Sequence, residues 1–214
     1  MKVTAITVQA RNPDRVNVSI DGSYRLSLTV AQLAELGLRA DDVVGDMELQ
    51  ELEAASTYGK LYQRTLEYAL MRPRSIREIK DYLYRKTQTK AIRSRTTGTV
   101  SLREGVDVQV TEHVLEELIK KGYVSDVKFA DFWVRNRFVR KGVSVRKLRS
   151  ELLAKGVSSS VIDETLAATE RSDEDELAKV IAKKRARYSD DIKFMQYLAR
   201  QGFSYDDIKS ALQE

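Results

Sequence analysis

A repeat of 46 residues in the second half of the chain limits the possible folds more than any other sequence feature. The run Leu-Leu-Ala-Lys-Gly-Val-Ser begins at residue 152, and the related run Leu-Ala-Arg-Gln-Gly-Phe-Ser begins at residue 198. In both runs, isoleucine and leucine follow the serine at distances of four and eight residues. Self-similarity at a fixed period of this length is typical of tandem helical repeats.

An earlier copy of the unit is visible once an insertion is removed. Ser75 and Leu83 match Ser144 and Leu152 at an offset of 69 residues, and subtracting the 23 residues of segment 87–109 restores the offset of 46. This segment is rich in Thr, Ser, Gly and Arg and has no helical period, which predicts an inserted loop or a small flexible hairpin. The chain from residue 58 onward is therefore predicted to contain three copies of one unit.

Each copy has the pattern of three short helices. Apolar residues recur at steps of three and four residues on both sides of Lys141-Gly142, which we expect to end one helix, while Ser144 caps the next. Lys121-Gly122 and Lys155-Gly156 are expected to be further helix ends. Short helices are marginal alone, so the copies should stack on one another. The predicted fold class is mainly α, with three tandem three-helix repeats in an elongated curved solenoid, preceded by a small N-terminal β-hairpin or sheet.

The N-terminal region alternates apolar and polar residues, as strands do. Asp21-Gly22 separates two such runs, and a three-residue loop that pairs Ile20 with Tyr24 would place both apolar sets on one face. Residues 2–9 are expected to add a strand, and a short helix from Val30 should end at Gly37. Asp46 is expected to be the N-cap of a helix that runs toward Ala55.

These patterns divide the chain into four predicted segments. The N-terminal hairpin and short helices occupy residues 1–57, and the first repeat, with its insertion 87–109, occupies residues 58–126. The second repeat occupies residues 127–173, and the third occupies residues 174–214.

Several classes of catalytic site are disfavoured by composition. The chain has no cysteine and one histidine, His113, which has no second histidine or thiol with which to bind a transition metal. Gly59-Lys60 lacks the other residues of a phosphate-binding loop. The acidic runs 173–176 and 190–191 are expected to cap helix N-termini rather than bind metal. We therefore expect no enzymatic activity, no cofactor and no metal.

The net charge of +5 hides a strong asymmetry along the chain. Residues 1–59 have a net charge of −4, residues 60–150 of +12, and residues 151–214 of −3. A basic block of this kind favours an anionic partner. The absence of cysteine leads us to expect a cytoplasmic protein, and the absence of a long apolar run leads us to expect no membrane contact. We also expect a monomer.

The basic block supplies the candidate binding residues. Any one of them can equally be an ordinary solvated side chain, but together they match the many cations that a phosphate backbone requires. Phe132 and Trp133 are assigned to the core, because they share an apolar stripe with Phe129. The candidates are Arg72, Arg74, Arg77, Lys80, Arg135, Arg137, Arg140, Lys141, Arg146, Lys147 and Arg149.

Several motifs resemble those of the RecX regulatory family. They are the run from Gly122 to Arg137 with Tyr123, Asp126 and Trp133, the run 147–156, the run 72–75, and the N-terminal Asp-Gly-Ser-Tyr at 21–24. The resemblance spans nearly the whole chain, with the motifs in the expected order. The insertion 87–109 is longer than the link that is usual there.

The resemblance implies a non-enzymatic regulator of the RecA recombinase. Such a protein would bind along the groove of the RecA filament on single-stranded DNA and inhibit its ATPase, strand exchange and coprotease activities, so modulating recombination and the SOS response. The basic face would also offer contacts to duplex DNA. The alternative, from another class, is a DNA-binding protein whose three-helix units act as helix-turn-helix readers without RecA.

Overall fold

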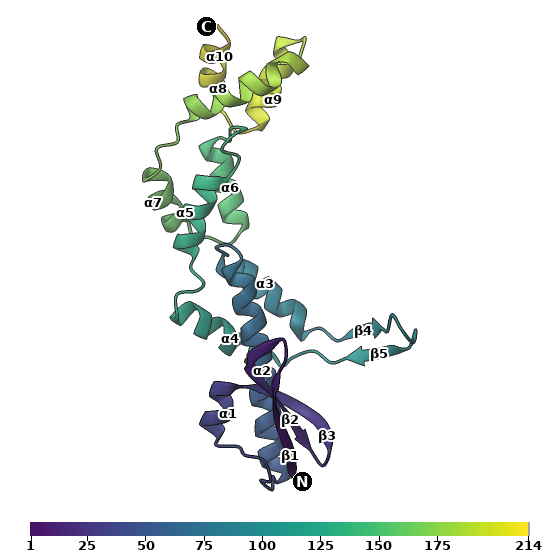
Figure 1. Cartoon of the computed structure of the whole chain (residues 1–214). Coiled ribbons are helices and arrows are strands. Elements are labelled where there is room, and N and C mark those ends of the chain that lie inside the picture. Colours follow the sequence, from purple (N-terminus) through teal and green to yellow (C-terminus); the bar gives the residue numbers. More distant parts are fainter. Residues whose placement is uncertain (214) are drawn as a thin grey trace. The chain divides into compact units, whose positions relative to one another are not determined.

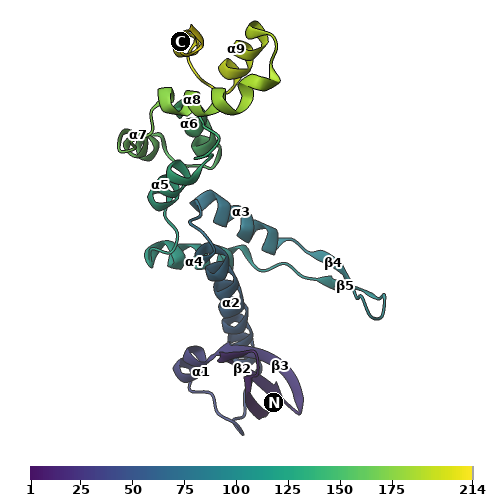
Figure 2. The ribbon, with the colours of Figure 1, turned by 45° about the horizontal axis from the view of Figure 1, so that its top comes forward.

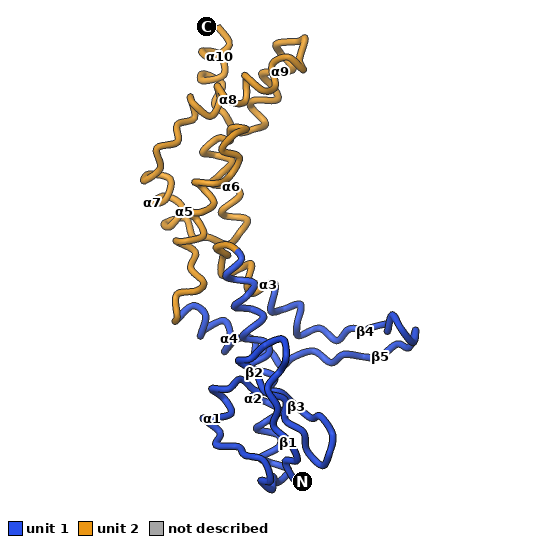
Figure 3. Tube along the Cα trace, in the orientation of Figure 1, with its two compact units in different colours: residues 1–71, 82–120 blue, residues 72–81, 121–214 orange. Residues whose placement is uncertain are grey.

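The chain is mainly helical, with a small antiparallel sheet at its N-terminus, as the sequence predicts (Figure 1). The computed structural model describes residues 1–213. Two units are distinguished by their internal contacts: unit 1 contains residues 1–71 and 82–120, and unit 2 contains residues 72–81 and the chain from Lys121 onward (Figure 3). None of the helices within residues 1–213 is long and apolar enough to cross a lipid bilayer.

The sheet of unit 1 consists of β1 (Val3–Gln9), β2 (Asn12–Ile20) and β3 (Ser23–Thr29), in the order β1-β2-β3. Valine and leucine side chains from β2 and β3 alternate with polar ones, so one face of the sheet is apolar. This face is buried with Leu49 and Leu52 in a single core.

The prediction of a three-residue hairpin loop is wrong. Ile20 pairs with Ser23 across the two-residue turn Asp21-Gly22, and both turn residues have positive φ, at 49° and 81°. The register then shifts between Val18 and Ser19, so that Val18 faces Leu26. A β-bulge therefore places the two apolar sets on one face of the sheet. The prediction had reached the same alignment with a longer loop.

Helix α1 (Val30–Leu36) ends at Gly37 as predicted, with φ of 65° at that glycine. The next helix differs from the prediction. Helix α2 (Asp46–Leu70) is continuous through the predicted boundary at residues 57/58, and its N-cap is Gly45, with Asp46 in the first turn. The division of the chain into four segments otherwise stays a prediction.

The insertion forms a two-stranded ribbon between α3 (Ile76–Thr87) and α4 (Val108–Lys120). Its strands are β4 (Lys90–Arg93) and β5 (Val100–Arg103), and every residue in them is exposed. The ribbon extends away from the adjoining helices in both views (Figures 1 and 2). At its base, Val106 donates a backbone hydrogen bond to Lys86 (2.9 Å), and a Cβ on Gly105 would lie 1.8 Å from the Thr87 carbonyl oxygen, so only glycine fits there.

Unit 2 contains the remaining helices. In the second repeat these are α5 (Asp126–Asn136), α6 (Val145–Ala154) and α7 (Ser159–Ala167). In the third they are α8 (Asp173–Lys184), the 3-10 turn η1 (Arg185–Arg187), α9 (Asp191–Arg200) and α10 (Tyr205–Gln213). Helix α5 ends at Asn136, earlier than the predicted end at Lys141-Gly142, and Phe138 after it has φ of 49°.

Burial follows the sequence repeat. Leu148, Leu152 and Ile162 are fully buried in the second repeat, and the residues 46 positions later, Phe194, Leu198 and Ile208, are fully buried in the third. The predicted serine caps are also present, because Ser75 accepts a hydrogen bond from Glu78 N and Ser144 accepts one from Lys147 N, each at 3.1 Å.

Helix α6 is capped twice, once by Ser144 and once by the repeat that follows. The Asp173 carboxylate accepts a hydrogen bond from Val145 N at 2.7 Å. An equivalent bond at the preceding junction joins Ile76 N to Asp126 at 2.8 Å. Burial raises the pKa of Asp173, although the bond from Val145 N lowers it. The acidic run 173–176 thus caps a helix, as predicted, but the helix belongs to the previous repeat.

Glu176 joins the second and third repeats through a buried ion pair. Its side chain is 2% exposed and accepts hydrogen bonds from Arg171 (2.6 Å), Lys179 (2.7 Å) and Val143 N (2.9 Å). Arg171 also donates to the carbonyl oxygens of Val134 and Arg137. Burial alone would raise the pKa of Glu176, but these bonds and the charge of Arg171 hold it below the ordinary value.

We predict that Glu176→Gln lowers the free energy of unfolding of unit 2 by about 3 kcal/mol at neutral pH, since it leaves Arg171 without its buried counter-charge. A lowered folded-state pKa stabilises the fold above the ordinary carboxyl pKa of 4.5, and this contribution is lost as the pH falls through the lower value. Urea unfolding followed by the fluorescence of the single tryptophan measures both effects. If the difference in the free energy of unfolding between variant and parent stayed constant into acid pH, the stabilising role assigned to the ionised Glu176 would be wrong.

We also predict that a short Gly-Ser link can replace residues 88–104 without loss of the helical fold. The strands are exposed throughout, and shortening a closed loop changes the free-energy cost of closing it by only about 1 kcal/mol. Thermal unfolding followed by circular dichroism should show one cooperative transition within a few degrees of the parent. Loss of cooperativity would show that the ribbon supports unit 1.

Candidate nucleic-acid interface

The candidate cations divide into those that hold the fold together and those that face solvent. All of them lie on α3, α5 and α6 or in the turns before α3 and α6. Arg77, Lys80, Arg140 and Arg146 are exposed, and within residues 1–213 none has an ion pair or a side-chain hydrogen bond. Half-buried Arg74 is engaged with its surroundings, so it is not grouped with them.

Arg72 holds the first turns of α3 against the second repeat. It donates two hydrogen bonds to the Glu78 carboxylate, each of 3.0 Å, and its guanidinium lies 6.0 Å from the centre of the Phe129 ring. Lys155 donates to the same carboxylate at 2.8 Å. Burial would raise the pKa of Glu78, but the bonds from Arg72 and Lys155 lower it below its usual value. Arg72 and Lys155 therefore stabilise the fold and are not available for a partner.

Arg137 is engaged in a similar way on the second repeat. It pairs with both oxygens of Glu151, at 2.7 and 2.9 Å, and lies over the rings of Trp133 (4.8 Å) and Phe138 (3.8 Å). The Trp133 indole N–H donates to Glu151 at 3.0 Å. Burial would raise the pKa of Glu151, but the bonds from Arg137 and Trp133 lower it. Trp133 packs on the core as expected, yet it is only partly buried.

Three further candidates have weaker partners at the surface. Arg135 pairs with Asp131 one turn earlier at 2.6 Å, Arg149 pairs with Asp163, and Lys147 donates to Gln201 at 2.6 Å. Exposed pairs of this kind contribute about 0–1 kcal/mol, so an incoming phosphate can replace them. Among the described residues, Lys141 has only a ring contact, 5.9 Å from the centre of Phe138.

Two exposed arginines occupy equivalent positions at successive junctions. The Arg77 side chain lies over Gly156, where an added Cβ would come within 2.9 Å of it, and the Arg146 side chain lies over Gly202, at 3.6 Å. These pairs are related by the offsets of 69 and 46 residues that define the repeat. The free cations thus recur with the repeat, as expected for a surface that follows a periodic anionic partner.

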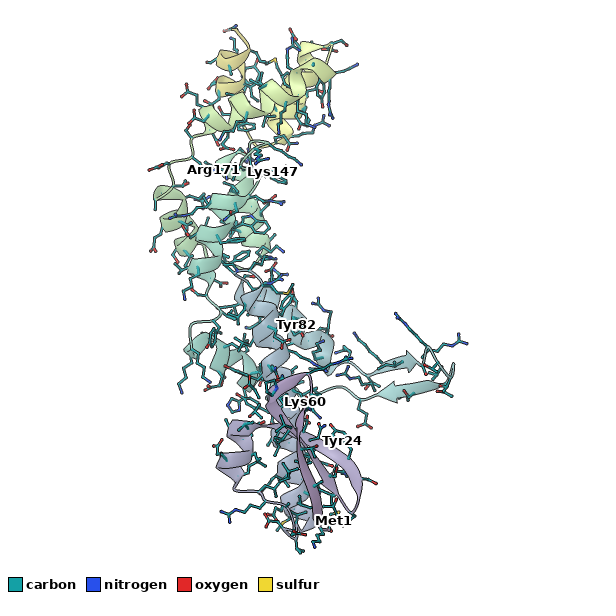
Figure 4. All side chains as sticks on the ribbon, in the orientation of Figure 1. Met1, Tyr24, Lys60, Tyr82, Lys147 and Arg171 are labelled. Atoms are coloured by element: carbon teal, nitrogen blue, oxygen red, sulfur yellow. The ribbon has the colours of Figure 1, made fainter. Side chains whose placement is uncertain are left out.

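Sequence reasoning missed two other groups of cations. Lys183, Lys184 and Arg187 line a pocket together with Lys147 of the second repeat, which is labelled in Figure 4. The net charge of −3 over residues 151–214 concealed this basic run at 183–187. Residues 85–103, which include the ribbon, contain six Arg or Lys and no Asp or Glu, a signal that was visible within the inserted segment.

The structure also shows the surroundings of the residues considered for catalysis. His113 is exposed, and its ring lies 4.9 Å from that of Tyr58. Among residues 1–213 no group of three or more His, Cys, Asp or Glu side chains could hold a metal ion. Asp190 caps α9 as expected, accepting from Ile192 N and Lys193 N.

We predict that Arg137→Ala destabilises unit 2 by roughly 2–4 kcal/mol, because it leaves the partly buried Glu151 without its partner. Arg140→Ala, three residues later and unpaired, should change stability by less than about 0.5 kcal/mol. Urea denaturation of both variants tests the division into structural and free cations. Equal losses would show that the division is wrong.

Comparisons with known proteins agree with the architecture. Residues 1–45 match the family model "Regulatory protein RecX N-terminal domain", and residues 125–166 match "RecX, second three-helix domain". The chain is 29% identical to the regulatory protein RecX of Bacillus licheniformis, over 99% of this chain and 76% of that protein. It is 25% identical to that of Clostridium botulinum, over 100% and 95% respectively.

A solved structure supports the fold independently. The crystal structure of a regulatory protein RecX superposes with a TM-score of 0.68 at 21% sequence identity, covering 100% of this chain and 99% of the other. The two domain models match in the order in which the N-terminal sheet and the second repeat occur along the chain. The two domain models, the full-length relatives and the shared fold together support assignment of the chain to the RecX family of regulatory proteins.

Proposed function

We propose that this protein binds the RecA filament on single-stranded DNA and inhibits the ATPase, strand exchange and coprotease activities of RecA. It would act as a cytoplasmic monomer and so modulate recombination and the SOS response. Similarity to RecX regulatory proteins supports RecA as the partner. A regulator needs only binding surfaces for this role, and the chain supplies them as basic helix faces.

The observation that carries the proposal is the recurrence of unpaired cations at equivalent places. Arg77 and Arg146 lie over the glycines that end the second helices of successive repeats. Lys80 and Arg149 occupy the next equivalent positions, one turn further along α3 and α6, and of these two only Arg149 has an ion-pair partner, the surface residue Asp163. A filament presents its phosphates and protein surface at regular intervals, so a repeated cationic face matches it better than a single patch would.

A DNA-binding protein that acts without RecA is the second candidate. The exposed ribbon favours it, because a two-stranded β-ribbon fits the major groove of duplex DNA and this one has basic residues on both strands. Co-sedimentation separates the two functions. Retention on RecA filaments well above retention on the same DNA alone supports the regulator, and equal retention supports the alternative.

We predict that the protein slows ATP hydrolysis by RecA on single-stranded DNA, while the quadruple variant Arg77→Glu, Lys80→Glu, Arg140→Glu, Arg146→Glu has lost this effect. The matched control reverses four exposed cations elsewhere, Arg11, Arg39, Lys193 and Lys209, for the same change in net charge. A phosphate-release assay over a range of salt concentrations is the measurement. Each lost phosphate contact should reduce the salt slope by about 0.7.

Unchanged RecA turnover at stoichiometric excess of the parent protein would remove the functional proposal. Equal loss of inhibition in the variant and the control would show that net charge matters and the repeated face does not.

A further inference from the structure

A cationic pocket lies where the third repeat joins the second. Its volume is about 610 Å³, within the range of sites that hold small ligands. One lining residue, Gly142, packs closely on the third repeat, because an added Cβ there would lie 2.2 Å from the Glu176 carbonyl oxygen. Ten residues line it, none of them acidic, and five are cations: Lys141, Lys147, Lys183, Lys184 and Arg187.

The absence of acidic residues distinguishes this pocket from a second pocket in unit 2. That pocket of about 630 Å³, which also includes residues of both repeats, is lined by Arg135, Arg171 and Lys179 together with four acidic residues, so its formal charges sum to −1. Unbalanced positive charge gathered in one concave site attracts anions, because the surrounding protein screens it less than bulk water does.

The third repeat supplies the cations that have no partner. Lys183 and Lys184 end α8, and Arg187 ends the turn η1. None of these three has an ion pair or side-chain hydrogen bond to any described residue, and Lys184 is half-buried. A bound anion would supply the counter-charge that these three cations lack among the described residues.

Two aromatic rings complete the lining. Phe138 and Tyr197 are both half-buried, so part of each ring remains accessible from the pocket. Tyr197 is held from behind by Tyr188 and Phe194, with ring centres at 5.4 and 6.3 Å. Burial and Tyr188 raise the pKa of Tyr197 against the opposing charge of Arg187, so the phenol remains neutral at physiological pH.

We propose that this pocket binds a segment of single-stranded nucleic acid, with phosphates at Lys183, Lys184 and Arg187 and a base against Tyr197 or Phe138. Sites for single strands combine a cationic groove with aromatic side chains on which bases stack. An acidic peptide would use the cations but not the rings. A free nucleotide shares the chemistry of the strand, so the test must separate the two.

The inference deepens the proposed function, because single-stranded DNA is the track on which a RecA filament forms. It also gives the third repeat a role that its second helix, with only Lys193 and Arg200 as basic residues, does not suggest. The test contains no RecA, so failure of the pocket and failure of the RecA proposal give different results.

The experiment measures binding of a fluorescein-labelled oligothymidylate to the full chain by fluorescence anisotropy. The pocket variant is Lys183→Glu, Lys184→Glu, Arg187→Glu, and the matched control is Lys193→Glu, Arg200→Glu, Lys209→Glu in the same repeat. We expect the pocket variant to lose about tenfold or more in affinity and to reduce the salt slope by about 2, and the control to stay within about twofold. Tyr197→Leu, which keeps an apolar side chain on the core, should weaken binding about fivefold or more.

Competitors identify the ligand. Unlabelled oligothymidylate should displace the probe at far lower phosphate concentration than ATP, the same strand in a duplex, or polyglutamate. Equal competition by ATP would make this a nucleotide site, and equal competition by polyglutamate would make it a surface for acidic peptides. Either result, or equal loss of affinity in the pocket variant and the control, would overturn the proposal. Circular dichroism of each variant establishes that the protein is folded.

Discussion

The carboxylate of Glu176 is the interaction on which the arrangement of the second and third repeats depends. It accepts hydrogen bonds from Arg171, Lys179 and the backbone N–H of Val143. Arg171 also donates hydrogen bonds to two carbonyl oxygens at the end of α5. Every polar atom in this buried group has a partner, and no buried side-chain nitrogen or oxygen within residues 1–213 is left without one. A buried charge is tolerated only under such conditions. Glu176, Arg171 and Lys179 also line the pocket of about 630 Å³.

The two junctions of unit 2 use the same geometry with different chemistry. A carboxylate from the start of one repeat caps the second helix of the preceding repeat in both, through Asp126 at the first and Asp173 at the second. The residue before the junction glycine then reaches back to the preceding repeat. Lys155 meets the carboxylate of Glu78, whereas Gln201 accepts from Lys147 at the position 69 residues after Glu78. Short helices that are unstable alone are thus completed by their neighbours.

The helical repeat could be predicted because its signals are local. Capping serines, junction glycines and apolar residues at helical spacing each act within one turn, and the structure contains them at the expected residues. Features that depend on distant residues could not be predicted in this way. The bulge that corrects the hairpin register depends on which face of β3 meets α2, and the continuity of α2 past Ala55 depends on packing along its whole length.

The candidate site shows the same limit. All the predicted cations are basic side chains on or beside the expected helices, but a sequence cannot show which of them face a carboxylate from another repeat. Arg72 and Arg137 do so, and they are part of the structure of the fold. Conversely, Lys183, Lys184 and Arg187 lie in an acidic region of the sequence and come together with Lys147 only when the repeats stack. The net charge of a long segment does not reveal a site of three cations, because acidic residues elsewhere in the segment cancel their charge.

Helix α2 belongs at once to the N-terminal sheet and to the first repeat. Its first half completes the core of the sheet through Leu49 and Leu52, and its second half continues toward Ala69 among the helices of the repeat, over a length of about 38 Å. If either end of α2 unfolds, the apolar residues that this end packs into a core become exposed. Because the sheet, α2 and α4 lie in one compact unit, we expect them to unfold together as one foldon.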